Sequence, residues 1–273
     1  MSDATRVAIV GLGAIGGSVA LKLLSRGITP RGFTTNPADH DLAAAAGVSV
    51  AESVNVAVAG ADLILVAVPL DQLGEVARTV ISAAPDTATV LHTASLQRPS
   101  ATGLTPECDR VIGTHPLAGT ERAGFAAASA DMFQGAIIYA EPRGTRRIRE
   151  DVELFWSLGG AARIEYLDAT DHDDHMAAVS HVPQLLASAL ASVLAREHVA
   201  ASDLGPGGRD MTRLAGSSWP MWAPLISATP KRTTQLLEQI VNELSRVRSA
   251  IENREVAGLE PLWKRAGDWQ RID

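Results

Sequence analysis

The stretch Arg6-Val7-Ala8-Ile9-Val10-Gly11-Leu12-Gly13-Ala14-Ile15-Gly16 decides the fold of this chain. Residues 6–10 form a short apolar run, which is typical of a strand buried on both faces. The glycines that follow have the G-x-G-x-x-G spacing, and residues 18–26 have the apolar spacing of a helix that stops at Gly27. A strand, a glycine-rich turn and a helix in this order form the context in which this motif binds a dinucleotide.

Each glycine of the turn has a separate purpose. Gly11 permits the tight turn, Gly13 lets the backbone approach the pyrophosphate, and Gly16 lets the helix pack on the strand. The helix begins near Ala14 and Ile15, where free N–H groups and a partial positive charge face the phosphates. We therefore expect these five residues to bind the cofactor.

The region up to residue 167 alternates buried strands with helices. The expected strands after the first are at 30–34, 62–68, 87–92, 111–114 and 136–140, and the expected helices after the first are at 39–46, 72–84 and 145–158. This alternation predicts βαβ units and a mostly parallel sheet of the Rossmann type.

After Asp168 the pattern changes, and no strand is expected. Helices are predicted at 172–196, 219–227 and 231–252. The sequence therefore predicts a dinucleotide-binding domain at 1–167 and an all-α substrate and dimerisation domain at 168–273.

Composition excludes several other classes of protein. The 273 residues carry a net charge of −7, which argues against a nucleic-acid partner because phosphate binding needs a positive field. The basic run 143–149 is expected to be a solvated face. Cys108 is the single cysteine, so neither a disulfide framework nor a cysteine zinc site is expected. The start lacks a leader pattern and the apolar run 185–195 is too short to span a bilayer, so no membrane association and a cytoplasmic location are expected.

The choice between NAD and NADP depends on the end of the second strand. An NAD site usually has an acidic residue there, which binds the ribose 2′-hydroxyl. Thr34 occupies that place, and Thr34, Thr35 and Asn36 could donate hydrogen bonds to a 2′-phosphate. The sequence therefore favours NADP, with NAD as the alternative, and Arg31 is interpreted as a strand-edge residue.

A second distinctive segment is 113–121, Gly-Thr-His-Pro-Leu-Ala-Gly-Thr-Glu. His115 directly follows an expected strand, at the edge of the sheet where α/β proteins bind ligands. This segment, together with Ser180–Leu186 (SHVPQLL) and Arg209–Ala215 (RDMTRLA) followed by Pro220-Met221-Trp222, resembles the prephenate/arogenate dehydrogenase family. Leu117 stands where the family pattern has methionine.

The resemblance implies an NAD(P)-dependent oxidative decarboxylation of prephenate or arogenate in tyrosine biosynthesis, by a homodimer joined through the C-terminal helices. It implies that His115 accepts the proton of the ring hydroxyl, which suits a side chain with a pKa of about 6.5. It implies that Ser95 hydrogen-bonds His115 or the substrate hydroxyl. Val68 and Pro69 join the expected cofactor residues.

The resemblance also implies a set of substrate residues. Arg213 would bind a carboxylate through its planar fork. His181 would be a second histidine at the substrate, Asp210 would orient an arginine or gate the pocket, and Glu121 would be an acidic gate at the pocket mouth. Thr114, next to His115, is expected at the substrate as well.

The serine block departs from the family pattern D-x-x-S-x-K, because His92 replaces the acid and Gln97 replaces the lysine. This leaves open a sensor that binds NAD(P) without turnover. A dehydrogenase of an amino-prephenate analogue in specialised metabolism is another alternative. No metal site is expected, although His172 and His175 are three residues apart on one helix.

Overall fold

The structure is a computed structural model and describes residues 5–104, 109–119 and 122–271. Its first part is an eight-stranded sheet in the order β3-β2-β1-β4-β5-β6-β7-β8. The strands are β1 (Val7–Val10), β2 (Arg31–Phe33), β3 (Ser49–Val50), β4 (Leu63–Val66), β5 (Thr89–His92), β6 (Val111–Pro116), β7 (Ile137–Ala140) and β8 (Arg163–Tyr166).

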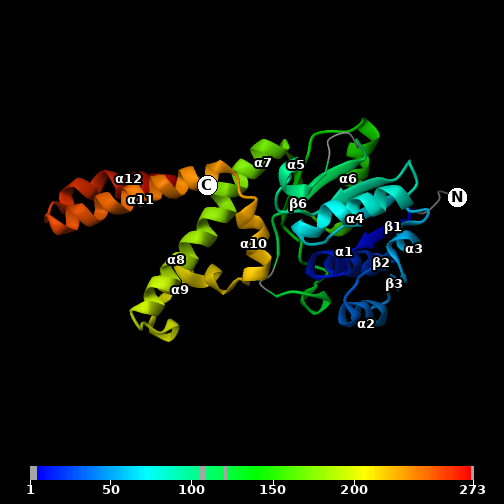
Figure 1. Ribbon diagram of the computed structural model, residues 1–273, viewed down its shortest axis with the longest axis horizontal. Coiled ribbons are helices and arrows are strands. Elements are labelled where there is room, and N and C mark those ends of the chain that lie inside the picture. Colours follow the sequence, from blue (N-terminus) through cyan, green and yellow to red (C-terminus); the bar gives the residue numbers. More distant parts are fainter. Residues whose placement is uncertain (1–4, 105–108, 120–121, 272–273) are drawn as a thin grey trace.

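Helices cover this sheet and then continue away from it (Figure 1). The helices are α1 (Ala14–Ser25), α2 (Pro37–Ala45), α3 (Val54–Val58), α4 (Leu70–Ala83), α5 (Pro99–Thr102), α6 (Arg146–Gly159), α7 (Ala169–Met176), α8 (Val182–Arg196), α9 (Pro206–Thr212), α10 (Trp219–Ser227), α11 (Lys231–Glu252) and α12 (Glu260–Trp269).

Strand pairing in the sheet is parallel except between β6 and β7. In that antiparallel pair Thr114 lies opposite Ala140, and His115 lies opposite Tyr139. The expected mostly parallel Rossmann-type sheet is therefore confirmed. The short strands β3 and β8 and the helices α3, α5, α9 and α12 were not predicted, because each is too short or too polar to show a clear apolar period.

The two faces of the sheet pack into separate apolar clusters, because successive strand residues point to opposite sides. Ile9, Leu65 and Leu91 join the cluster that contains α1 and α6, including the fully buried Trp156. Val10 joins the cluster on the opposite face, beneath α3 and α4. Burial on both faces fixes the positions of the strands and therefore of the loops at their carboxyl ends.

The second part is entirely helical within the described residues that follow Tyr166. The helices α7 and α8 are joined by a π-helical turn, Ala177–His181. Farther along, α11 and α12 lie side by side and extend away from the sheet (Figure 1). The predicted helices 219–227 and 231–252 have those bounds in the structure, which confirms the helical C-terminal part.

The run Ala169–Arg196 is long and apolar enough to cross a membrane by length and composition alone. Core helices of soluble proteins meet the same criterion.

Two alanine substitutions in the glycine turn should separate its packing role from its binding role. A Cβ on Gly16 would collide with the carbonyl oxygen of Gly11, whereas a Cβ on Gly13 has no atom within 4 Å. We expect Gly16→Ala to lower the free energy of unfolding by about 1–3 kcal/mol, as overpacking does. Gly13→Ala should leave it nearly unchanged and weaken binding of the dinucleotide instead. Thermal unfolding and cofactor titration measure both, and equal stability of the two variants would contradict the packing argument.

Candidate active site

The nucleotide turn connects β1 to α1 at the carboxyl edge of the sheet. Gly11 has φ +99°, and a Cβ there would collide with the carbonyl oxygen of Ala67 on the neighbouring loop. Its N–H donates to the Phe33 carbonyl oxygen (2.8 Å), which ties the turn to the end of β2. The space beside Gly13 is open, at the N-terminus of α1. These features fit a pyrophosphate, which needs close backbone approach and free N–H groups.

The other expected cofactor residues lie at the same edge. Val68 follows β4, and its Cγ1 atom is 3.1 Å from the position of a Cβ on Gly11. Pro69 is exposed immediately before α4. Thr34 and Thr35 follow β2. These four residues therefore lie around one edge of the sheet. Their contact with a cofactor stays a prediction.

The end of β2 carries hydroxyl and amide groups where an NAD site usually has an acid. The Thr34 hydroxyl oxygen accepts a hydrogen bond from the Asn36 N–H (3.3 Å), so its own O–H can donate elsewhere. Asn36 caps α2 by accepting from the Ala38 N–H (3.0 Å). Arg31 lies at the opposite end of β2, where its guanidinium donates to the carbonyl oxygens of Val56 and Ala59. As interpreted from sequence, Arg31 belongs to the strand and not to the ribose site.

His115 lies within β6 rather than directly after it, because the pairing with β7 lengthens the strand to Pro116. The His115 Nδ1 atom is 3.0 Å from the Nε2 atom of His172, on α7. The His172 Nδ1 atom is in turn 2.8 Å from the Asp173 Oδ1 atom. His172 and Asp173 are almost completely buried. The structure thus forms a hydrogen-bonded chain of two imidazoles and a carboxylate.

The pKa of His115 is lowered from 6.5 to about 3, first by burial and then by the charges of His172, His181 and His92. The neutral form of the imidazole is therefore favoured, and the neutral form can accept a proton. Its Nε2 atom makes no hydrogen bond to any part of the chain that the structure describes. His115 is therefore neutral at physiological pH, with an imidazole nitrogen that no described residue occupies.

Ser95 and Thr114 differ from their expected contacts. Ser95 lies half-buried in the loop after β5, and its hydroxyl makes no hydrogen bond to His115, whose partner is His172. Thr114 is completely buried, and its hydroxyl donates to the His92 carbonyl oxygen (3.1 Å). The expected contact of Thr114 with substrate stays a prediction, although its hydroxyl already has a partner within the sheet.

His181 ends the π-helical turn and lies close enough to His115 for its charge to affect the pKa of His115. Its Nδ1 atom is 3.1 Å from the Thr229 hydroxyl, and its ring meets that of Trp222 edge-on at 6.0 Å. Burial lowers the pKa of His181, so the neutral form is favoured here as well. A π-helical turn is a frequent feature of functional sites. His181 and His115 are thus brought together from distant parts of the sequence.

The structure does not bring Arg213 and Asp210 to this chain of histidines. Both side chains are exposed, and no ion pair joins them to each other or to another described residue. The turn after Arg213 is held on α8 by Gln184, whose amide donates to the Leu214 carbonyl oxygen (2.9 Å). Glu121, the expected acidic gate, lies outside the described residues.

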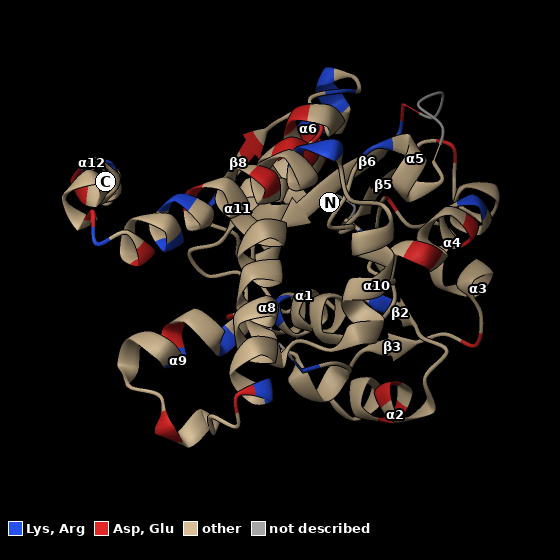
Figure 2. Ribbon diagram, turned by 60° about the vertical axis from the view of Figure 1, so that its left-hand side comes forward, with Lys and Arg blue, Asp and Glu red and all other residues tan. Residues whose placement is uncertain are grey.

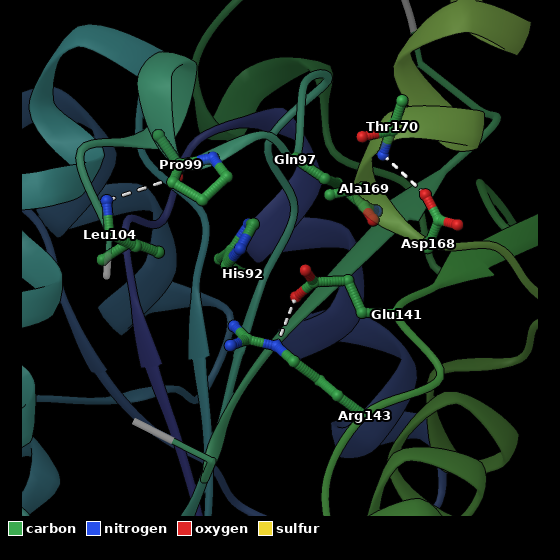
Figure 3. A pocket seen from close by; sticks show the side chains of 10 residues that line it. His92, Gln97, Pro99, Leu104, Glu141, Arg143, Asp168, Ala169 and Thr170 are labelled. Atoms are coloured by element: carbon green, nitrogen blue, oxygen red, sulfur yellow. Dashed lines mark hydrogen bonds and ion pairs between the residues drawn. The ribbon is translucent and has the colours of Figure 1, made fainter. Parts of the chain in front are cut away.

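A cavity of about 280 Å³ lies beside the loop that follows β5 and carries Ser95 (Figure 3). His92 and Gln97, the two departures from the family pattern, line it together with Glu141 and Arg143. The Gln97 side-chain amide donates to the Tyr139 carbonyl oxygen (3.2 Å), while its Oε1 atom is buried without a partner. Glu141 accepts from the Gly113 N–H (2.9 Å) and from Arg143 (3.1 Å). The Gln97 side chain is therefore bonded to β7 through its NH2 group, and the His92 Nδ1 atom accepts from the Ala94 N–H (3.4 Å).

Neither the histidine pair on α7 nor the basic run forms a separate site. His172 contacts His115, whereas the His175 Nε2 atom is 3.2 Å from the Tyr139 hydroxyl, so the two imidazoles have different partners. Within the described ranges, no group of three or more histidine, cysteine or acidic residues could hold a metal. In the basic run, Arg146 and Arg147 pair with Glu150 and Asp151 one turn on. Figure 2 shows these mixed charges on α6.

Sequence reasoning missed His172 and Asp173 as parts of this site. The sequence pattern indicated His172 only as a neighbour of His175, and the helix gave no sign of which strand it would meet. The signal that could have found them is the adjacent histidine and aspartate at the junction of the two parts of the chain, because such a pair can orient a third group.

Acidification should destabilise the fold through His92. Burial, and then the charges of Arg143 and His172, lower the pKa of His92 from 6.5 to about 3. Below pH 6.5 the unfolded chain therefore binds more protons than the folded one, so stability falls as pH falls. We expect a loss of roughly 2 kcal/mol from this residue between pH 6.5 and 5. Denaturant unfolding of His92→Gln should show a shallower pH dependence, with His40→Gln as an exposed control. An unchanged dependence would contradict this assignment.

Comparison with known proteins agrees with this arrangement. Residues 19–161 match the nucleotide-binding domain of prephenate dehydrogenase, and residues 168–264 match its dimerization domain. The prephenate dehydrogenase of Bacillus subtilis is 27% identical over 97% of this chain and 75% of that protein. That of Lactococcus lactis is 31% identical over 57% of this chain, but the match spans only 43% of that protein.

The fold is shared with a crystal structure of prephenate dehydrogenase from A. aeolicus in complex with hydroxyphenyl propionate and NAD+. That structure has a TM-score of 0.84, 24% identity and 99% coverage of both chains. The expected family and enzyme class are confirmed: this chain belongs to the prephenate dehydrogenase family of nicotinamide-dependent oxidoreductases.

Proposed function

We propose that this chain oxidatively decarboxylates prephenate or arogenate with a nicotinamide cofactor, as a step of tyrosine biosynthesis. The observation that carries the proposal is the placement of His115 at the carboxyl edge of β6. Its Nδ1 atom is bonded to His172, and its Nε2 atom is available to a substrate. The glycine turn lies at the same edge, because β1 and β6 run in the same direction through β4 and β5.

When bound, a nicotinamide supplies the acceptor for the hydride that leaves the hydroxyl-bearing ring carbon. His115 takes the proton of that hydroxyl on the lone pair of its Nε2 atom, as a general base. The electrons of the broken bond to the carboxylate then complete the aromatic ring as carbon dioxide leaves. This loss is driven by aromatisation and requires no metal.

The remaining substrate contacts are part of the proposal. Ser95 is half-buried in the loop tied to α7, where its hydroxyl can bond the substrate hydroxyl. His181, neutral and near His115, contacts the substrate from the helical side. Arg213 is exposed and can bind a carboxylate, with Asp210 and Glu121 acting around the pocket mouth. Prephenate and arogenate differ by a keto and an amino group on the side chain, and both are proposed as substrates.

We propose NADP as the preferred cofactor, with NAD as the alternative. The support is the end of β2, where Thr34 can donate a hydrogen bond and no carboxylate would repel a 2′-phosphate. Gly11, Gly13, Ala14, Ile15 and Gly16 hold the pyrophosphate, with Val68 and Pro69 on the adjacent loop.

We further propose a homodimer joined through the C-terminal helices. Several large apolar side chains on α11 and α12 are more than half exposed, which is unusual unless a partner covers them. They are Val241 (59%), Leu244 (59%), Ile251 (60%), Trp263 (66%) and Trp269 (73%).

Three other expectations stay predictions from sequence. They are the domain division between residues 167 and 168, a cytoplasmic location, and the lack of nucleic-acid or membrane partners.

The alternative, a nucleotide-binding sensor without turnover, drew its support from His92 and Gln97. Both side chains are buried, and the hydrogen bonds from His115 to His172 and from His172 to Asp173 are intact. This geometry favours catalysis over the sensor.

The activity itself is tested with purified protein, prephenate or arogenate, and NAD+ or NADP+, by following the absorbance of the reduced nicotinamide. We expect turnover with at least one pair, and a fall of about 100-fold or more in His115→Asn, because a general base contributes at least that much. Affinity for the nucleotide should be nearly unchanged. Nucleotide binding without turnover for every pair would support the sensor, and activity that survives in His115→Asn would remove His115 from its role.

Cofactor preference is tested by Thr34→Asp. The new carboxylate should repel a 2′-phosphate and accept from a 2′-hydroxyl, so the ratio of kcat/KM for NADP+ to that for NAD+ should fall about tenfold or more, or about 1.4 kcal/mol. Thr29→Asp makes the same charge change before β2, at the opposite end of the strand, and should leave the ratio unchanged. An unchanged ratio in Thr34→Asp would contradict the assignment of this residue to the ribose.

A further inference from the structure

We propose that His172 and Asp173 are positioning residues that hold His115 in the one tautomer able to act as a base. This inference rests on the proposed function of His115. The three groups form a continuous chain, with His115 Nδ1 3.0 Å from His172 Nε2 and His172 Nδ1 2.8 Å from Asp173 Oδ1.

The direction of each hydrogen bond follows from Asp173. Its Oδ1 atom accepts from the Gln97 backbone N–H (2.8 Å), and its Oδ2 atom accepts from the Arg98 backbone N–H (3.1 Å). Arg98 also lies with its Nε atom 3.9 Å from Oδ2. Both carboxylate oxygens therefore act as acceptors, so the His172 Nδ1 atom carries a proton and donates it to Oδ1.

The tautomer of His172 then determines that of His115. A neutral imidazole with its proton on Nδ1 has its lone pair on Nε2. His172 Nε2 consequently accepts from the Nδ1–H of His115, and His115 keeps its own lone pair on Nε2. If His172 carried its proton on Nε2 instead, it would donate to His115 Nδ1 and place the His115 proton on the atom that must take the substrate proton.

The chain also stabilises the charge that catalysis creates. When His115 Nε2 gains the proton of the substrate hydroxyl, the imidazolium retains its Nδ1–H bond to His172. The negative charge of Asp173 lies beyond His172 in a buried setting, where electrostatic interactions are strong. Asp173 orients the chain through its hydrogen bonds, as the carboxylate does in catalytic triads.

Further hydrogen bonds anchor the elements that carry these three groups. Arg98 donates to the Thr170 carbonyl oxygen (3.1 Å) and to the Asp174 carboxylate (2.6 Å), so the loop after β5 is fastened to α7 at several points. The loop that carries Ser95 and the helix that carries His172 are therefore fixed relative to each other and to His115.

The test compares two substitutions of His172 that differ in whether the new side chain can hydrogen-bond His115 and Asp173. Glutamine can still accept from His115 Nδ1–H through its Oε1 atom and donate to Asp173, whereas phenylalanine can do neither. We expect His172→Phe to lower kcat about 100-fold at unchanged nucleotide affinity, and His172→Gln to stay within about tenfold of the wild type. His175→Phe, three residues on and bonded to Tyr139, is the matched control and should stay near the wild-type kcat.

If kcat falls equally in the two His172 variants, and the fall follows their loss of stability, the role of His172 is structural and the proposal is overturned. A second measurement needs neither His172 variant and does not depend on turnover. Nitrogen-15 NMR of the histidines in the nucleotide-bound enzyme, with His115→Asn identifying the His115 signals, should show His115 protonated on Nδ1. Protonation on Nε2 would overturn the proposal even in an active enzyme. A correct tautomer in a protein that turns over neither substrate would instead contradict the proposed function.

Discussion

The buried carboxylate of Asp173 is the interaction on which this site depends. A carboxylate removed from water costs several kcal/mol unless hydrogen bonds satisfy it. Here it accepts from the backbone N–H groups of Gln97 and Arg98 and from the imidazole of His172. The two backbone donors belong to a loop of the sheet, while His172 and Asp173 belong to the first helix after it. Satisfying one charge therefore joins the two parts of the chain at the point where chemistry occurs.

The sheet supplies the other constraint. Parallel strands bring their carboxyl ends to one edge, so the glycine turn after β1 and the histidine in β6 face the same region although Gly16 and His115 are 99 positions apart in the sequence. The antiparallel pairing of β6 with β7 then extends β6 past its parallel neighbours and holds His115 opposite Tyr139. A strand position gives the base a more rigid backbone than a loop would.

Much of this arrangement could be predicted from the sequence, because it depends on local pattern. The glycine turn, the strand before it and the two long C-terminal helices each have a strong period of their own. The partners of single polar side chains could not be predicted in the same way. The three-residue spacing of His172 and His175 does not indicate what either side chain will contact. The packing of α7 against β6 and β7 gives His172 a histidine partner and His175 a tyrosine partner. Thr114 is a similar case, since its hydroxyl donates to the His92 carbonyl oxygen of the neighbouring strand, a partner that its motif does not indicate.

The departures at positions 92 and 97 show how a loop can change side chains and keep its main-chain hydrogen bonds. What Asp173 requires from residue 97 is a backbone N–H, which glutamine provides as well as lysine would. The Gln97 side chain forms an additional bond to the Tyr139 carbonyl oxygen, within the strand that lies opposite His115. His92 contributes its carbonyl oxygen to Thr114, which is again independent of the side chain. Because main-chain groups make the contacts that hold the site, motif comparison alone overstates the damage that these two substitutions cause.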